Sequence, residues 1–442
     1  MVIVMGNFEV NLDVKSVGKY DVVVCGGGVA GFCAAVGAAR NGASVALVEK
    51  QGALGGVLTL GGNSDIGLFY AHKKQIIHGI GFEFVSRLRD LGGARFPDFE
   101  NETVHAKLNV MVNPFEAAKL MDDMCLEAGV NLYFGYDVCA VAKKDTELET
   151  NNTITSVIVT SKNGLQAIEG KIFIDCTGDG HLSYVSGAEW ELGSDCKEIQ
   201  PATFRAYIEG FKIEDIDRFQ VEEEYKKAIA NGTLDKNDYW GGKNVIDYFK
   251  NRANNANHIP YDFKSTSNME IEGRKSTTRV VNWARKHVKG AENLKVVTMS
   301  PNVAFREWRR IKCEHCVTSL EYTTGQRYPD GICNSFYPID MHKVDGNSLL
   351  CEQLEDGIVP CIPYRALIVK GIDNLLVAGR CIDSDRIANS ALRTKASCMA
   401  MGHSAGVAAS ETVKQGGSIR NVDLEKILKV LEEQHAINPG RA

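Results

Sequence analysis

The chain has no long apolar run, no basic leader and no large excess of either charge. Its 442 residues contain 50 Lys and Arg against 56 Asp and Glu, a formal net charge of −6. Nucleic-acid binding needs clustered positive charge, which this mildly acidic composition does not provide. No segment approaches the roughly 20 apolar residues that span a bilayer, and the opening MVIVMGNFEV lacks a signal peptide's basic region. We therefore predict neither a membrane nor a nucleic-acid partner.

Several catalytic and metal motifs are missing as well. The sequence has no GxSxG elbow, HExxH or P-loop, so hydrolase and kinase chemistry have no support. Its single CxxC is Cys313 to Cys316, whereas a tetrahedral zinc site needs four ligands and normally shows a second pair. We predict no metal and interpret these cysteines as two thiols on a helix face or loop. A redox pair is the alternative, but it would normally open a helix in a thioredoxin-like unit.

The 13 cysteines are an odd number, and they are scattered through predicted strands and helices. Apolar contexts surround Cys25, Cys33, Cys125, Cys176 and Cys398. Buried free thiols of this kind are typical of a reducing compartment. The cysteine pattern therefore predicts a cytoplasmic protein.

The most informative segment is residues 20–56, where an apolar run leads into Gly26-x-Gly28-x-x-Gly31. An Ala-rich helical stretch, a second apolar run and Glu49 follow. The first glycine allows a tight turn, the second lets a pyrophosphate approach the backbone, and the third lets helix and strand pack closely. Glu49 follows Gly26 by 49 − 26 = 23 positions, where a carboxylate accepts hydrogen bonds from an unphosphorylated ribose. The motif predicts FAD or NAD.

The rest of the chain indicates one nucleotide domain split in two. Helical spacing over 114–128 is followed by short strands at 132–134, 138–141, 154–159 and 172–176, which suggest a β-meander beside a parallel sheet. Periodicity is poor from about 196 to 345 and returns after 360 with a strand at 374–378 and helices at 397–411 and 423–434. We predict an α/β fold: a Rossmann-like domain over 1–195 and 346–442, with an α+β substrate domain inserted at 196–345.

A later element favours FAD over NAD. Residues 373–381 form a strand that ends at Gly379, followed by a polar segment and a helix from about 391 to 404. NAD dehydrogenases of this size rarely need this element, whereas the pyrimidine ring of a flavin needs its own hydrogen-bond donors. The N–H groups of Ser390 to Leu392 at the helix start would stabilise the charge that develops there on reduction.

Together these residues resemble the bacterial FAD-dependent oxidoreductase family, which is distantly akin to the fumarate reductase and succinate dehydrogenase flavoproteins. The segments that carry the resemblance, in order, are GGGVAG, VEK, LGG, CTGDGHLSYVSGAEWELG, FREWRRI, YPIDMH, NLLVAGRCIDSDRIANSALR and CMAMGHSAGVAA. The resemblance implies a two-domain flavoprotein and covers most of the chain.

The resemblance also assigns cofactor contacts to residues of this sequence. It implies that the first glycine motif and the following acid hold FAD, that the LGG loop runs under the flavin and that one backbone strand holds the adenine. A turn beside the adenine and a closing motif near the pyrophosphate complete the set. These residues are Gly26, Gly28, Ala30, Gly31, Glu49, Lys50, Gly55, Gly56, Val57, Val138, Thr177, Gly178, Asp179, Gly379 and Arg380, with Ser390 and Leu392 at the helix start.

The chain departs from the family pattern at two places. After Arg393 the family has an apolar-proline stretch, whereas this chain has Thr394-Lys395-Ala396. After RRI the family has a glycine, whereas this chain has Cys313-Glu-His-Cys316. The first departure concerns the surroundings of the flavin pyrimidine, and the second is the cysteine pair discussed above.

Five side chains are candidates for substrate chemistry. Arg309, with its neighbours Arg306 and Arg310, could hold a carboxylate through bidentate contacts, the alternative being a structural ion pair. His342 could exchange a proton at neutral pH, the alternative being a packed histidine. Arg393, near the predicted helix start, could stabilise reduced flavin or substrate.

Our first hypothesis is an FAD-dependent oxidoreductase that holds FAD noncovalently. It would exchange a hydride between flavin N5 and a small organic substrate lying between the domains. A flavin electron-transfer subunit that serves a partner protein and a flavin monooxygenase are the alternatives. The oligomeric state stays open, with a homo-oligomer among the options.

Overall fold

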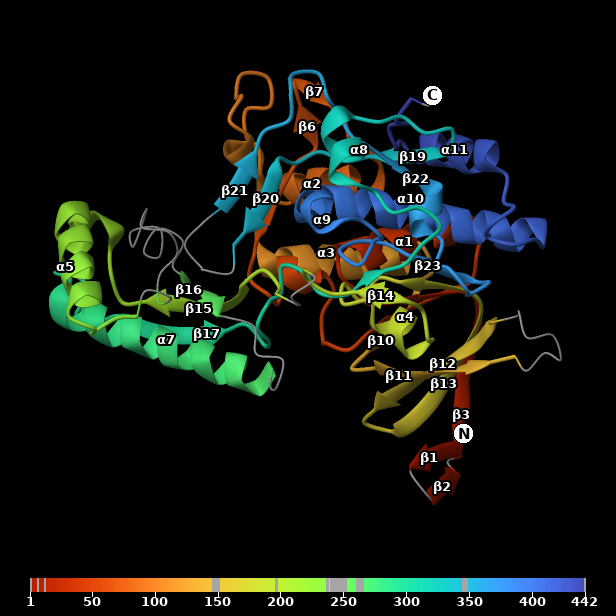
Figure 1. The fold of residues 1–442 in the computed structure, drawn as a ribbon, viewed down its shortest axis with the longest axis horizontal. Helices are drawn as coiled ribbons and strands as arrows, with labels where there is room; N and C mark the ends of the chain where they lie inside the picture. The colour runs from red at the N-terminus through yellow and green to blue at the C-terminus, as the bar shows by residue number, and fades with distance from the viewer. Residues whose placement is uncertain are drawn as a thin grey trace.

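The structure is a computed structural model that describes residues 2–5, 8–11, 13–144, 152–194, 198–235, 238, 253–259, 266–343 and 349–440. Figure 1 shows a larger body that carries both chain ends and a smaller unit at its side. The smaller unit contains the helices α5 (Arg218–Ala230) and α7 (Thr266–His287).

Within the described residues, seven strands form the central sheet of the larger body. They are β3 (Lys15–Cys25), β4 (Val45–Glu49), β10 (Asn131–Phe134), β11 (Asp137–Lys143), β12 (Ile154–Ser161), β13 (Gly164–Asp175) and β23 (Leu375–Val377). Their order is β10-β4-β3-β13-β12-β11, and β23 also pairs with β13. β10, β4, β3, β13 and β23 are parallel, whereas β11, β12 and β13 form an antiparallel meander. The predicted α/β fold class, a parallel sheet with a meander, is confirmed.

β13 joins the two halves of this sheet. It starts at Gly164, eight positions before the predicted strand at 172. Its first half pairs antiparallel with β12, and its last residues pair parallel with β23, for example Ile174 with Leu376. A strand from the C-terminal part of the chain thereby enters the same sheet as the first glycine motif.

The apolar run of β3 is buried on both faces of the sheet. Val22 and Val24 pack into one hydrophobic cluster, and Val23 and Cys25 pack into the other. A parallel strand covered on both sides needs apolar residues at every position, which is why this run does not alternate.

Two helices pack unusually closely beside the sheet. α1 (Val29–Arg40) follows β3, and α10 (Lys395–Gln415) crosses it. A Cβ atom at Gly402 would lie 2.0 Å from the carbonyl oxygen of Ala30, and one at Gly406 would lie 2.1 Å from that of Ala34. Because glycine carries no Cβ, the two backbones can touch, as the Ala/Gly-rich composition of the predicted helix suggested.

The smaller unit is a separate antiparallel sheet with helices against it. β15 (Ala202–Glu209) lies between β16 (Ala253–Ile259) and β17 (Lys295–Met299). Alternate residues of β15, such as Phe204 and Ile208, are buried, and Thr203 and Arg205 lie on the other face. The division into domains at 1–195, 196–345 and 346–442 stays a prediction.

The structure corrects one helix boundary. The sequence predicts a single helix from about 391 to 404, but α9 (Arg386–Leu392) ends at Leu392, with Arg393 as its C-cap, and α10 begins at Lys395. Thr394, with extended backbone, is the N-cap residue between them. Ser390 and Leu392 therefore lie in the last turns of α9, and their predicted position at a helix start is wrong.

The remaining elements connect and cover these layers. The helices are α2 (Gly79–Asp90), α3 (Pro114–Glu127), α4 (His181–Val185), α8 (Ser319–Thr324) and α11 (Leu424–Glu433). The strands are β1 (Val2–Met5), β2 (Phe8–Asn11), β5 (Asp65–Ile66), β6 (Tyr70–Ala71), β7 (Lys74–Gln75), β8 (Ala94–Arg95), β9 (Val110–Val112), β14 (Trp190–Glu191), β18 (Arg310–Ile311), β19 (Gly331–Asn334), β20 (Ile339–His342), β21 (Leu349–Glu352) and β22 (Cys361–Pro363).

Candidate active site

A cavity of about 690 Å³ opens at the carboxyl ends of the parallel strands. Residues that follow β3, β13 and β23 line one end of it, and residues of β15, β20 and the 301–306 segment line the other. In open α/β sheets ligands bind outside the carboxyl ends of the strands, so this is the expected place for a nucleotide.

The first glycine motif shapes one wall of the cavity. Gly26 has φ +97°, and a Cβ there would lie 2.4 Å from the carbonyl oxygen of Cys176, so a side chain would clash with backbone. A Cβ at Gly31 would lie 1.8 Å from the carbonyl oxygen of Gly26, which fits its predicted role in close packing. A Cβ at Gly28 would meet no atom within 4 Å and would enter the cavity that this residue lines.

Glu49 lies beside this turn at the end of β4. Its carboxylate accepts hydrogen bonds from the backbone N–H groups of Gly27, at 2.6 Å, and Gln51, at 2.7 Å. Glu49 and its neighbour Lys50 both line the cavity. The hydrogen bond from Gly27 fixes the acid against the glycine turn.

The LGG loop runs along the same wall. The N–H of Gly55 donates to the carbonyl oxygen of Gly27 at 2.8 Å, so the loop lies directly against the turn. Gly55 has φ +99° and Gly56 has φ +55°, the left-handed region that glycine tolerates. Val57 is 41% exposed, and it lines the cavity together with Gly55 and Gly56.

The predicted turn at 177–179 and the closing motif at 379–380 contact each other directly. Arg380 donates through Nε to the carbonyl oxygen of Gly178 at 3.0 Å and forms an ion pair with Asp179. Thr177, Gly178, Asp179, Gly379 and Arg380 all line the cavity, as does Ala30 at the start of α1.

Five predicted residues lie outside the lining, and one of them is Gly31, which packs against the carbonyl oxygen of Gly26. Arg309 lies over the rings of Tyr184 and Trp190, with its guanidinium carbon 4.1 Å from the tyrosine ring centre. The carbonyl oxygen of Val138 accepts a hydrogen bond from Nε2 of His181 at 2.9 Å. Ser390 and Leu392 are buried within α9. The structure therefore does not bring Arg309 to the cavity, in contrast to His342 and Arg393, which line it.

The other end of the cavity is lined by ionisable groups that the sequence prediction partly missed. They are Asp65, Arg205, Arg306, Asp340, His342, Arg393 and Lys395. Arg205 could have been found from the alternation along β15, and Asp340 from its i, i+2 spacing to His342 on β20. Lys395 occurs where the chain departs from the family pattern.

Neighbouring charges and burial shift the pKa values of these groups. Burial lowers the pKa of His342 to about 4, although Asp340, 3.6 Å away, opposes that shift, so the imidazole is neutral at pH 7. Burial, and then the positive charges of Arg393 and Arg205, lower the pKa of Arg306 to about 9. Burial also lowers the pKa of Lys395, opposed by Asp65 at 3.6 Å.

The cysteine pair occupies a different environment. Cys313 is buried and Cys316 is half-buried, and burial, followed by the charge of Asp383, raises the pKa of Cys316 to about 12. Such a thiol carries little thiolate at neutral pH and is a poor nucleophile. Within the described ranges no group of three or more His, Cys, Asp and Glu side chains is arranged to hold a metal.

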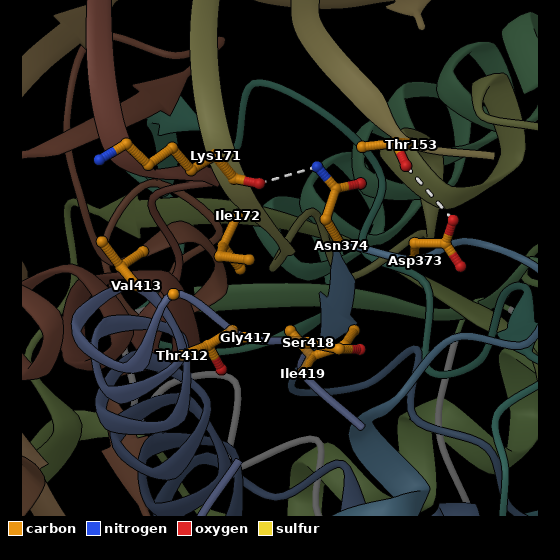
Figure 2. A pocket seen from close by; sticks show the side chains of 11 residues that line it. Thr153, Lys171, Ile172, Asp373, Asn374, Thr412, Val413, Gly417, Ser418 and Ile419 are labelled. Atoms are coloured by element: carbon orange, nitrogen blue, oxygen red, sulfur yellow. Dashed lines mark hydrogen bonds between the residues drawn. The ribbon is translucent and has the colours of Figure 1, made fainter. Parts of the chain in front are cut away.

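A second hollow, of about 370 Å³, lies near the amino end of β23 (Figure 2). Its polar groups bond to one another: Asn374 donates to the carbonyl oxygen of Lys171 at 2.8 Å, and Thr153 donates to Asp373 at 3.3 Å. It contains none of the predicted site residues.

The family described as FAD dependent oxidoreductase matches residues 21–431, nearly the whole chain. The chain belongs to this family. FAD is its cofactor, and the protein is an oxidoreductase enzyme. The glycine cradle of the cavity fits FAD, because Gly28 leaves open the space that a side chain would fill.

Similarity to individual proteins is lower. Over 120 residues this oxidoreductase is 32% identical to a soluble pyridine nucleotide transhydrogenase of Chromohalobacter salexigens, an alignment covering 27% of this chain and 24% of that protein. The chain therefore aligns with about a quarter of that relative's length.

Among solved structures, it is similar to a geranylgeranyl bacteriochlorophyll reductase-like protein from Thermoplasma acidophilum, with TM-score 0.44, 11% identity, and coverage of 94% and 84% of the two chains. It is also similar to an L-proline dehydrogenase from P. horikoshii, with TM-score 0.36, 12% identity, and coverage of 97% and 100%. Among the helices of the described residues, none has the length and apolar character needed to cross a membrane.

Proposed function

We propose that this oxidoreductase exchanges a hydride with a small organic substrate bound in the polar end of the cavity, with FAD held noncovalently at the glycine-rich end. The observation that carries the proposal is that one continuous cavity is lined both by the dinucleotide motif and by a cluster of ionisable side chains from β15, β20 and the 301–306 segment. A domain division near 196 and 345 would place this cavity between the two domains.

When bound, FAD supplies the acceptor or donor of the hydride, and the protein supplies orientation and proton transfer. Arg306 and Arg393 line the polar end and would bind and orient the substrate. His342, neutral at pH 7, would accept the proton that leaves a substrate hydroxyl or amine as the hydride departs from the adjacent carbon. Asp340, 3.6 Å from Nε2 of His342, would stabilise the imidazolium that forms.

The proposed FAD site is tested by replacing Gly28, where a Cβ would enter open space. Gly28→Val puts a side chain where no atom lies within 4 Å, and φ −65° suits any residue, so the fold should persist while FAD is displaced. Gly417→Ala is the matched control, because its Cβ also meets open space but lies away from this cavity. The purified parent and control should be yellow and release FAD on denaturation, whereas Gly28→Val should be colourless. A Gly28→Val protein with full FAD content would contradict the proposed site.

The test of the reaction is anaerobic. A substrate should bleach the flavin absorbance near 450 nm in the parent and do so much more slowly in His342→Gln, which retains hydrogen bonding but not the proton transfer. Bleaching at equal rates would remove His342 from the reaction. Oxygen consumption driven by a nicotinamide cofactor and dependent on an organic substrate would instead favour the monooxygenase alternative.

A further inference from the structure

The charges lining the cavity are distributed unevenly between its two ends. At the nucleotide end, Glu49 and Asp179 balance Lys50 and Arg380, and Arg380 is paired directly with Asp179. At the polar end, the cations are Arg205, Arg306, Arg393 and Lys395, and the acids are Asp65 and Asp340. With His342 neutral, the polar end carries 4 − 2 = 2 positive charges in excess.

Arg306 is anchored but leaves donors available. Its Nη1 donates to the carbonyl oxygen of Pro201 at 2.6 Å and to the hydroxyl of Thr203 at 2.8 Å. No described residue accepts a hydrogen bond from its Nε or Nη2. One edge of a rigid guanidinium fork is therefore held by the protein while the other is left for a ligand.

Arg393 also has one guanidinium nitrogen bonded to the protein and another that is left for a ligand. Its Nη2 donates to the carbonyl oxygen of Asp340 at 3.0 Å and lies 3.5 Å from the carboxylate of the same residue. Its Nε is buried and has no acceptor among the described residues. A buried charged donor without an acceptor is costly, so an oxyanion that reached Nε would remove a penalty as well as gain an attraction.

These cations repel one another in the absence of a counter-charge. Arg393 and Arg205 each disfavour the charged form of Arg306, and Asp340 opposes them. Arg205 also disfavours the charged form of Lys395, where the attraction of Asp65 is larger than this repulsion. The pyrophosphate of FAD is expected at the start of α1, at the other end of the cavity, so it does not supply the missing negative charge.

We propose that the substrate of this oxidoreductase is a small organic dianion whose oxyanion groups are bound by Arg306 and Arg393, with Arg205 and Lys395 supplying the remaining positive field. The proposal rests on the proposed function for its hydride chemistry. Carboxylate and phosphate groups both match a guanidinium fork, and the experiment below distinguishes them.

The binding test uses the FAD-loaded protein and follows the flavin difference spectrum during titration. The probes are acetate, malonate, succinate and glutarate, inorganic phosphate and sulfate, and the neutral analogue succinamide. At least one dicarboxylate should perturb the spectrum with a dissociation constant at least tenfold lower than that of acetate, weakening as salt is added. Succinamide should have no effect. Tighter binding of phosphate than of any dicarboxylate would identify the oxyanion as phosphate.

Removing a cation and removing an acid from the polar end should change the affinity for the dianion in opposite directions. Arg306→Gln should weaken binding of the best dianion at least tenfold, and Arg306→Lys, which keeps the charge but not the fork, should weaken it less. Asp340→Asn raises the excess from two to three charges and should tighten binding several-fold. Arg274→Gln, which removes an exposed cation of α7, is the control and should change nothing.

The possible outcomes distinguish a failure of the dianion inference from a failure of the proposed function. A protein that holds no FAD would overturn the proposed function itself. A protein that holds FAD but binds succinamide as well as succinate, or whose Asp340→Asn variant binds the dianion more weakly, would overturn only the dianion inference. If Arg306→Gln does not fold, the dissociation constants of the dianion for Arg306→Lys and Asp340→Asn decide the question.

Discussion

The crossing of α1 and α10 gives the sharpest prediction, because two physical effects there have opposite signs. Gly402→Ala should be stabilising by about 1 kcal/mol if only helix propensity matters, since glycine in a helix interior is disfavoured against alanine. The new Cβ, however, would lie 2.0 Å from the carbonyl oxygen of Ala30. Real Cβ contacts essentially never fall under 3.0 Å, so the helices must separate locally by about 3.0 − 2.0 = 1.0 Å.

The cost of the backbone clash should exceed the gain in helix propensity. The atom struck belongs to backbone, which cannot rotate away, so the overpacking cost should reach about 3 kcal/mol, the upper part of its usual range. The net loss is then about 2 kcal/mol. With an unfolding entropy of about 2.1 cal/mol/K per residue, a chain of 442 residues should then lose about 2 °C in its thermal midpoint.

The same displacement of α1 should also disturb the FAD site. Ala30 lines the cavity, so moving α1 away from α10 shifts the backbone that follows Gly28. We therefore expect Gly402→Ala to weaken FAD binding by more than tenfold as well as lower the thermal midpoint. Both quantities can be measured together, by flavin release and by circular dichroism during heating.

Gly417→Ala provides the reference for the alanine substitution itself, because its Cβ meets no atom within 4 Å. Gly406→Ala, with its Cβ 2.1 Å from the carbonyl oxygen of Ala34, should behave like Gly402→Ala in stability. An unchanged or raised midpoint for Gly402→Ala, relative to Gly417→Ala, would refute the argument that backbone contact dominates this crossing.

Two further predictions concern buried ionisable groups. Burial lowers the pKa of His403 to about 4, below its usual 6.5, so below pH 6.5 the unfolded chain binds a proton that the folded chain does not. The stability that this neutral histidine contributes is fully present above pH 6.5 and falls by about 1.4 kcal/mol per pH unit toward pH 4. The variant His403→Leu should therefore show a smaller fall in thermal midpoint between pH 7 and pH 5 than the parent protein. An equal fall in both proteins would contradict this prediction. Glu307 is fully buried and accepts hydrogen bonds from Arg386 at 2.8 and 3.0 Å. Arg386→Leu should lower the free energy of unfolding by about 3 kcal/mol. In Arg386→Leu the Glu307 carboxylate keeps its hydrogen bonds from Gln200 but loses the charge of Arg386. Adding Glu307→Leu should recover part of the loss, and a double variant no more stable than Arg386→Leu would show that this unpaired charge is not the cause.

Local sequence determined the nucleotide end of the cavity. Gly26, Gly28, Gly31 and Glu49 lie within one strand-helix-strand unit, where backbone torsion angles and a short turn fix their relative positions. Such a unit has the same geometry wherever it occurs, and its residues could be named before any fold was known. The buried strands were equally predictable, because a strand covered on both faces must be apolar throughout.

Tertiary structure decided which of the candidate side chains meet at the polar end. Arg205, Arg306, Asp340 and Arg393 come from four separate elements of the chain, and only the packing of the β15 sheet, β20 and the α9–α10 junction brings them to one cavity. Arg309 was one of the candidates by sequence, yet it faces Tyr184 and Trp190, because the direction of a side chain outside regular structure depends on its neighbours. The break at Arg393 and Thr394 was also missed by the periodicity argument, since apolar spacing continues across two helices that are separated by only these two capping residues. A motif confined to neighbouring residues is thus determined by the sequence, whereas a charge cluster assembled over long separations depends on how the layers pack.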